Sequence, residues 1–167
     1  MKEKRENIIE EFQSNKVNEF ENNIIKHNIE NNVEYIQFKR LLAYPEIKHA
    51  YILKNFDRNF RVGKDFRNIQ SVKENLEEVS KIIDIDYESI VRPDFDHTNH
   101  VDVISSIDET ELPNLRGINF PKTDGLMTEK EIITLMATNA DCNLLLIYDP
   151  VKKVIANIHA RLERNIR

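Results

Sequence analysis

The chain has 167 residues, of which 40% are hydrophobic and 32% are charged, and its formal net charge is −5. This length supports one core of ordinary size or a large piece of one, and the negative charge argues against nucleic acid as a partner. No apolar stretch approaches the roughly 18 residues of a membrane span, and the first residues lack a signal peptide, so we expect a cytoplasmic protein without a membrane partner.

The first half of the chain is predicted to combine helices with short strands. Residues 4–25 are mostly polar with apolar side chains on one side, which predicts a charged helix at the start of the chain. Alternating apolar residues predict strands over residues 31–38 and 47–53. From residue 69 to residue 83 apolar residues recur every three or four positions, and this spacing predicts an amphipathic helix.

The second half is predicted to be mostly β-sheet. Four strand-like runs cover residues 100–107, 131–138, 143–149 and 152–159. Asp149 and Pro150 separate the last two runs, which predicts a hairpin. These patterns together predict an α+β fold. The chain has only 3 glycines, so Gly-rich phosphate loops are excluded.

Residues able to bind a metal gather in this half. His97 precedes a predicted strand, Cys142 lies between two strands, and His159 ends the last one. Two imidazoles and a thiolate are a sufficient ligand set for Zn²⁺. The same residues also fit a buried cysteine with two ordinarily hydrogen-bonded histidines, or a Cys142 nucleophile activated by His159.

Four motifs carry a family resemblance. They are DGLMT at residues 124–128, ADC at 140–142, YDP at 148–150 and HA at 159–160. In their order and spacing the chain resembles the YfiH/YlmD family, also named laccase-domain or polyphenol oxidase proteins and understood as purine nucleoside phosphorylases. The upstream segments RNFRVGKD and DHTNHV extend the resemblance.

The resemblance implies a YfiH-like fold of the αββα type, with mixed β-sheet layers flanked by helices. It implies a Zn²⁺ ion bound by His97, Cys142 and His159, and purine nucleosides and phosphate as partners. The implied reactions are phosphorolysis of adenosine, inosine, guanosine and methylthioadenosine, and deamination of adenosine. Asp141 and Cys142 are the expected catalytic residues, although Asp141 also fits a turn residue that bonds its own backbone. His100 is expected at the surface or beside a ligand.

The chain departs from the family pattern at two places. Phe95 replaces a glutamine that the family usually has two residues before its first histidine. After His159-Ala160 the family reads Gly-Trp-Arg-Gly-Thr, whereas this chain reads Arg-Leu-Glu-Arg-Asn. One inserted base in the gene would convert the first reading into the second, so we expect residues 161–167 to be a frameshifted tail.

The expected organisation is therefore a charged helical extension over residues 1–19, the N-terminal part of a catalytic domain over residues 20–160, and an aberrant tail over residues 161–167, with the C-terminal part of the fold missing. Two functions stay open. One is a zinc-dependent purine nucleoside phosphorylase and adenosine deaminase impaired by truncation. The other is a non-catalytic zinc-binding remnant or interaction module. Copper-dependent phenol oxidation is less favoured because multicopper sites need more histidines than the 5 in the chain.

Overall fold

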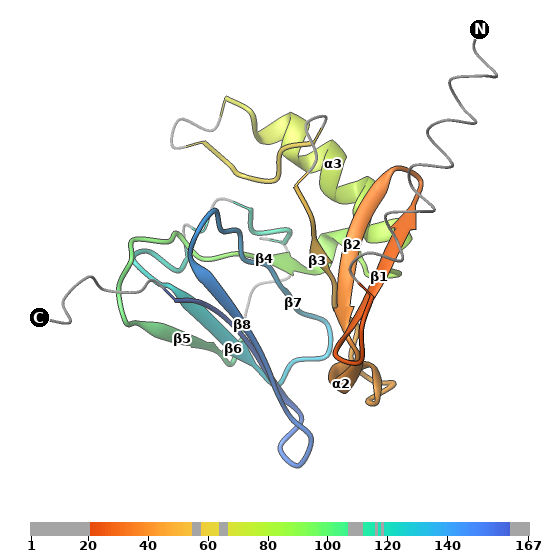
Figure 1. Cartoon of the computed structure of the whole chain (residues 1–167). Coiled ribbons are helices and arrows are strands. Elements are labelled where there is room, and N and C mark those ends of the chain that lie inside the picture. Colours follow the sequence, from red (N-terminus) through yellow and green to blue (C-terminus); the bar gives the residue numbers. More distant parts are fainter. Residues whose placement is uncertain are drawn as a thin grey trace, which may run out of the picture. The chain divides into compact units, whose positions relative to one another are not determined.

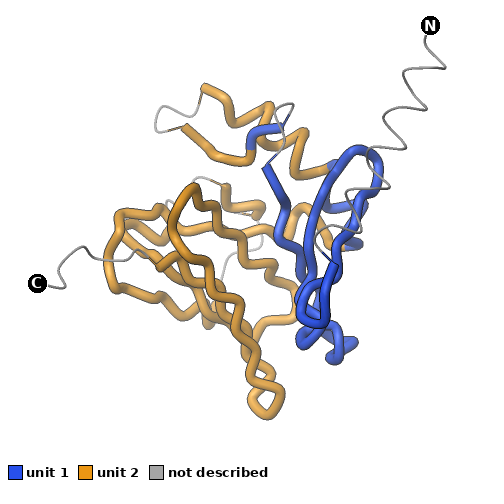
Figure 2. The backbone as a smooth tube through the Cα atoms, viewed as in Figure 1, with its two compact units in different colours: residues 1–59, 78–84 blue, residues 60–77, 85–167 orange. Residues whose placement is uncertain are grey.

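The computed structural model describes residues 21–54, 58–63, 67–106, 112–115, 117 and 119–160 (Figure 1). The predicted extension over residues 1–19 and the predicted tail over residues 161–167 lie outside the described residues. The chain divides into two compact units. One comprises residues 1–59 and 78–84, and the other comprises residues 60–77 and 85–167 (Figure 2). Within the described ranges, no helix is long and apolar enough to cross a membrane.

The first unit contains an antiparallel sheet of order β1-β2-β3. Its strands are β1 (Ile25–Glu30), β2 (Val33–Phe38) and β3 (Tyr51–Ile52), and a short helix, α2 (Lys39–Leu42), follows β2. The strand predicted over residues 31–38 is confirmed as β2. The strand predicted over residues 47–53 is confirmed only in part, because β3 occupies two of its residues.

The predicted helix over residues 4–25 is wrong at its end, because Ile25 begins β1. Asn31 and Asn32 join β1 to β2, and both have positive φ angles, of 48° and 61°. Two consecutive residues with positive φ form the tight turn that suits the twist of a β-hairpin, and asparagine tolerates this conformation. The turn at Asn31 and Asn32 therefore favours a hairpin, and Ile25, whose apolar spacing also fitted the end of a helix, becomes the first residue of a strand.

The predicted amphipathic helix is confirmed as α3 (Ile69–Ile82). Val72 and Leu76, one turn apart on α3, are buried in a core cluster. In the second unit these two side chains pack with Tyr87, Ile90 and other apolar residues. Burial of this apolar stripe is what stabilises a helix of otherwise polar composition.

The second unit contains a mixed four-stranded sheet of order β5-β6-β9-β8, together with the short parallel pair β4 (Ile90–Val91) and β7 (Thr134–Leu135). The strands of the larger sheet are β5 (Val101–Ile104), β6 (Gly125–Thr128), β8 (Asn143–Asp149) and β9 (Val154–Ala160). β5 and β6 are parallel, whereas β9 is antiparallel to both of its neighbours. The α+β class with mixed sheets is thus confirmed.

The two faces of this sheet differ in burial. Ile104 and Leu126 point to one face, where they form a buried core cluster with Val91 and Ile133. The opposite face carries apolar side chains that stay partly exposed, namely Val101, Val103, Leu145 and Ile147. Because strand residues alternate between faces, His159 of β9, two residues after the partner of Leu126, lies on the same face as Leu126.

Candidate metal centre

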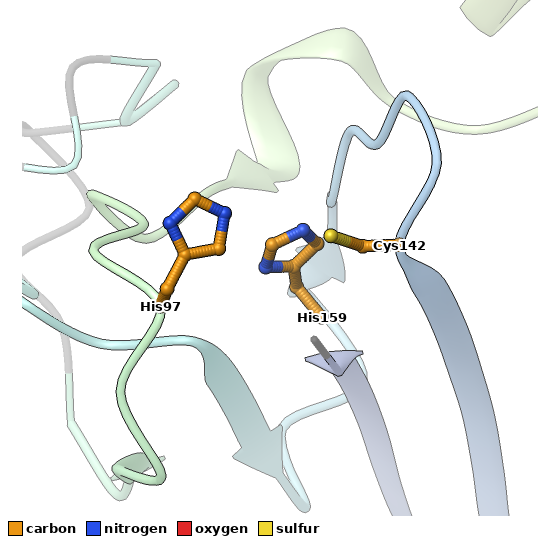
Figure 3. Close-up of side chains that lie close together, drawn as sticks. All are labelled: His97, Cys142 and His159. Carbon is orange, nitrogen blue, oxygen red and sulfur yellow. The ribbon is translucent and has the colours of Figure 1, made fainter. Parts of the chain in front are cut away.

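Three side chains with metal-binding atoms converge at one end of the mixed sheet. One ligand atom from each of His97, Cys142 and His159 lies within 4.8 Å of the other two. Figure 3 shows the ring of His159 between the His97 ring and the Cys142 sulfur. The ring centroids of the two histidines are 5.3 Å apart. His159 is buried, Cys142 is half-buried and His97 is exposed, so the cluster opens toward solvent on the His97 side.

The β8–β9 hairpin positions two of the three side chains. Leu144 pairs with His159 across the hairpin, and Cys142 lies two residues before Leu144. Cys142 directly precedes β8, and its sulfur lies beside the His159 ring (Figure 3). The turn that sets the register is stabilised by Asp149, whose Oδ1 accepts hydrogen bonds from the backbone N–H groups of Val151 (2.9 Å) and Lys152 (3.0 Å).

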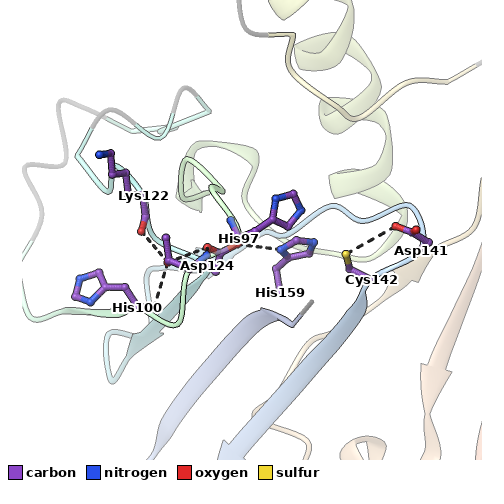
Figure 4. Close-up of polar contacts among 8 residues, drawn as sticks. His97, His100, Lys122, Asp124, Asp141, Cys142 and His159 are labelled. Carbon is purple, nitrogen blue, oxygen red and sulfur yellow. Dashed lines mark hydrogen bonds and ion pairs between the residues drawn. The ribbon is translucent and has the colours of Figure 1, made fainter. Parts of the chain in front are cut away.

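Asp124 connects the remaining histidine to the hairpin. It immediately precedes β6, and its carbonyl oxygen accepts the backbone N–H of His159 at 2.7 Å. Its carboxylate Oδ1 lies 3.1 Å from the backbone nitrogen of His97 and 3.0 Å from His159 Nδ1. Its Oδ2 accepts the Thr98 hydroxyl at 2.9 Å and also the Thr98 backbone N–H. Figure 4 draws the contact between Asp124 and the His159 ring.

His97 occupies a backbone conformation that needs such support. Its φ angle is +56°, in the left-handed region. For a residue other than glycine this region costs about 1–2 kcal/mol. The hydrogen bonds from His97 N–H and Thr98 N–H to the Asp124 carboxylate offset that cost and direct the His97 ring toward the hairpin.

The carboxylate of Asp124 is held in its ionised form. Burial alone raises the pKa of a carboxyl group because it disfavours charge. The hydrogen bonds from the Thr98 backbone, the His159 ring, the Thr98 hydroxyl and the His97 backbone outweigh burial, so the pKa of Asp124 lies below its usual value. An ionised carboxylate only accepts hydrogen bonds, and His159 Nδ1 is therefore the donor in their contact.

The donor set fits a zinc ion. Zinc prefers cysteine sulfur and histidine nitrogen, and bond lengths of about 2.0–2.3 Å place tetrahedral ligand atoms roughly 3.3–3.6 Å apart. The three ligand atoms lie within 4.8 Å of one another without an ion, so modest side-chain rotations close the gap. With its Nδ1 bonded to Asp124, His159 keeps Nε2 as a ligand atom, which is the usual arrangement for metal-binding histidines.

Two neighbours shape the surroundings of the centre. The Phe95 ring lies 5.1 Å from the His159 ring, and the Arg92 guanidinium lies over Phe95 at 5.6 Å from its centroid. Phe95 therefore shields one side of His159, at the position where a family glutamine would offer a polar amide. Asp141 lies beside Cys142, and its Oδ1 is 3.8 Å from the Cys142 sulfur.

The sequence-based candidate ligands are brought together in the second unit, and His100 lies at the surface as expected. His97, Cys142 and His159 converge, and Asp141 lies beside Cys142. His100 does not join the cluster, since its Nε2 contacts Asp102 at 3.1 Å. Sequence reasoning missed the site role of Asp124, although the DGLMT motif that begins with this residue was recognised. The motif gave no indication that its aspartate is buried against two histidine segments.

Three comparisons with known proteins point to the same family. A family model described as multi-copper polyphenol oxidoreductase laccase matches residues 50–161. Over 89 residues the chain is 30% identical to the purine nucleoside phosphorylase YlmD of Bacillus subtilis (strain 168), and the match covers 53% of this chain and 32% of that protein.

Two solved structures share the fold. YfiH of Bacillus licheniformis, a hypothetical protein, superposes with a TM-score of 0.53 at 19% identity, covering 77% of this chain and 45% of that one. YlmD from Geobacillus stearothermophilus gives a TM-score of 0.57 at 16% identity, covering 81% and 52%. The chain thus spans about half the length of these structures and 32% of the curated relative. With a matching family model over residues 50–161 and this shared fold, the chain belongs to the laccase-domain family that includes YfiH and YlmD.

Proposed function

We propose that the chain binds Zn²⁺ through His97, Cys142 and His159 and acts on purine nucleosides. The observation that carries the proposal is the convergence of two imidazoles and a thiol within 4.8 Å. The name of the Bacillus subtilis relative, purine nucleoside phosphorylase, supports the substrate class. The proposed reactions are phosphorolysis of adenosine, inosine, guanosine and methylthioadenosine, and deamination of adenosine, with phosphate as the second substrate of phosphorolysis.

Both reactions need proton transfer at the edge of the cluster. In phosphorolysis a phosphate oxygen bonds to ribose C1′ while the C1′–N9 bond breaks, and the purine leaves with the electron pair and takes up a proton. In deamination, water oxygen replaces the C6 amino group and ammonia leaves. A zinc ion with three protein ligands supplies Lewis acidity at an open fourth position.

Asp141 is the better candidate for moving the proton. It is exposed and lies beside Cys142, where a carboxylate can exchange protons with a bound substrate or with water. Asp124 is a poor candidate, because it is buried and all its carboxylate contacts are with hydrogen-bond donors of the protein. Cys142 acts as a ligand in this proposal.

Zinc is proposed rather than copper because the described histidines outside the cluster have other contacts. His27 contacts Glu34 at 3.0 Å, His49 accepts the Phe38 backbone N–H at 2.8 Å, and His100 contacts Asp102. A multicopper centre needs more imidazole ligands than the two that converge among the described residues.

Elemental analysis combined with a nucleoside assay tests the proposal. The purified chain is analysed for zinc and copper, and adenine, hypoxanthine and inosine are measured after incubation with adenosine and phosphate. We expect near-stoichiometric zinc and base release, both lost in Cys142→Ala. His100→Ala is the matched control, because it removes an imidazole outside the cluster and should preserve both.

The other outcomes separate the alternatives. A second candidate, a non-catalytic zinc-binding module, rests on the same convergence of ligand atoms, and it predicts zinc without any base release. Inactivation by alkylation with zinc retained would instead support Cys142 as a covalent nucleophile. Copper with phenol oxidation, or no bound metal at all, would overturn the zinc proposal.

A further inference from the structure

We propose that Asp124 is the positioning residue of the metal centre, holding His97 and His159 in register with each other through one carboxylate. This inference rests on the proposed metal centre, because positioning has a function only if the two histidines bind an ion. Nothing in the resemblance or in the comparisons gives this aspartate a role. Its assignment comes from the hydrogen bonds that meet at its two oxygens.

Each carboxylate oxygen of Asp124 has a distinct task. Oδ1 is shared between the His97 backbone nitrogen at 3.1 Å and the His159 ring Nδ1 at 3.0 Å. Oδ2 accepts both the backbone N–H and the hydroxyl of Thr98, which follows His97. The carboxylate thus bridges a turn that carries one candidate ligand and a strand that carries another.

The contact with Nδ1 selects the ring tautomer of His159. A carboxylate without a proton only accepts, so the proton of the neutral ring lies on Nδ1 and the lone pair lies on Nε2. Nε2 is then the atom available to a metal. Without the carboxylate, neutral histidine is free to place its proton on either nitrogen, and one of the two tautomers cannot bind a metal through Nε2.

Backbone hydrogen bonds fix the same segments. His159 N–H donates to the Asp124 carbonyl at 2.7 Å, and Asp124 N–H donates to the His100 carbonyl at 3.0 Å. These two bonds place the carboxylate where both histidine segments reach it. They do not depend on the side chain, so replacing the carboxylate leaves the backbone pairing of the segments intact.

Asp124→Asn is the test variant because it keeps the size and the backbone bonds. If the amide oxygen replaces Oδ1, the amide NH₂ faces the Thr98 N–H, and two donors oppose each other. If the oxygen replaces Oδ2, the NH₂ faces His159 Nδ1, which then must accept and leaves the ring proton on Nε2. In the first orientation the His159 ring keeps its proton on Nδ1, but the Thr98 N–H loses its acceptor and the His97 segment is disturbed. In the second orientation the tautomer reverses and the His97 N–H loses its acceptor.

Asp102→Asn is the matched control. Asp102 contacts the His100 ring at 3.1 Å and accepts the Thr123 hydroxyl at 2.5 Å, so it has the same kinds of partner. Its histidine is not among the three converging side chains. The amide oxygen of asparagine can still accept the Thr123 proton, so this variant should fold and leave the centre unchanged.

The first readout is the ring tautomer in the metal-free protein. Histidine ring ¹⁵N chemical shifts are recorded at about pH 8, well above the usual histidine pKa, with His159→Gln for assignment. We expect His159 of the unmodified chain to be protonated on Nδ1. The proton should move toward Nε2 in Asp124→Asn wherever the amide NH₂ faces the ring, and it should stay on Nδ1 in Asp102→Asn. Amide ¹H–¹⁵N spectra of each variant check the fold.

The second readout is zinc affinity, measured by competition with a chromophoric chelator. We expect Asp124→Asn to weaken zinc binding about 10- to 100-fold, as is typical when a ligand loses its carboxylate partner, and Asp102→Asn to change it less than twofold. Unchanged affinity in a folded Asp124→Asn protein would overturn the positioning role. So would a His159 ring protonated on Nε2 in the unmodified chain, a result that needs no folded variant.

The two proposals fail in different ways. If the unmodified chain binds no zinc, the metal centre is overturned and the positioning role with it, while a ring protonated on Nδ1 would still show that the carboxylate selects the tautomer. If zinc binds and the tautomer readout contradicts the expectation, the metal centre stands and the role of Asp124 falls.

Discussion

Two aspartate–histidine contacts of nearly equal length lie in the same unit and differ in burial. Asp124 Oδ1 and His159 Nδ1 are 3.0 Å apart with side chains only 3% and 6% exposed. Asp102 Oδ1 and His100 Nε2 are 3.1 Å apart with side chains 34% and 60% exposed. Distance alone therefore does not separate a structural contact from a surface one.

The difference shows what burial adds. The Asp124 and His159 side chains are almost fully buried, so losing the carboxylate leaves the His159 ring without an acceptor where water has little access. The His100 ring is mostly exposed, so it can hydrogen-bond water when the Asp102 carboxylate is lost. We expect variants at the two contacts to differ in metal binding, in stability and in pairwise coupling.

The largest expected difference is in metal binding. His159→Gln removes a candidate ligand and should lower zinc affinity by more than the roughly 100-fold expected for a lost ligand partner. His100→Gln should leave zinc affinity unchanged, since the ring lies outside the cluster. Equilibrium dialysis against zinc measures both. Similar losses in the two variants would show that His100, not only the three converging residues, binds the ion.

The second difference is in stability. Asp124→Ala leaves the His97 and Thr98 backbone donors and the His159 ring without their acceptor, and we expect it to lower the free energy of unfolding by about 3 kcal/mol or more. Asp102→Ala should lower it by about 1 kcal/mol or less. Urea unfolding of the metal-free proteins compares them. Equal losses of unfolding free energy in the two variants would show that burial does not strengthen the Asp124 contacts.

A third histidine, His49, sharpens the comparison because it is half-buried and hydrogen-bonds a backbone group instead of an aspartate. His49 accepts the Phe38 backbone N–H through Nε2, which only a neutral ring can do, and it stacks on the Phe38 ring. Burial lowers the pKa of His49.

The pKa of His49 in the folded protein thus lies below the unfolded value of about 6.5. The contribution of neutral His49 to the free energy of unfolding is therefore fully present above the unfolded pKa, and it is lost as the pH falls through the folded-state pKa. The free energy of unfolding should therefore fall as the pH is lowered from about 7.5 through the unfolded-state pKa and below it. The free energy of unfolding of His49→Gln should fall less over the same range. Parallel pH profiles for the two proteins would contradict this assignment.

The smallest expected effect is the coupling between His100 and Asp102. A double-mutant cycle of His100→Gln and Asp102→Asn should give a coupling free energy of about 0.5 kcal/mol or less, because the contact is exposed. Added salt should reduce it further if the ring is charged. A coupling of several kcal/mol would mean that exposure does not weaken this pair.

The elements that the sequence predicted well have strong local patterns. α3 follows a regular apolar spacing, and β8 and β9 are apolar runs separated by the Asp149 turn. The strands that were missed are β1, β4 and β6, and two of them, β1 and β6, have competing local signals. β1 continues a run that also fits a helix, and β6 is a four-residue segment that begins at Gly125 and gains its strand structure by pairing with β5 and β9.

The sequence by itself determined the α+β class, the hairpin and the identity of the three candidate ligands, because short-range spacing and family motifs record these features. The tertiary structure brings the three ligands together as the resemblance implied, and only the tertiary structure decided that Asp124 joins them. The Asp124 carboxylate meets a nitrogen 27 residues before it and a ring 35 residues after it. Contacts across such separations depend on strand register and on burial, which no local pattern specifies.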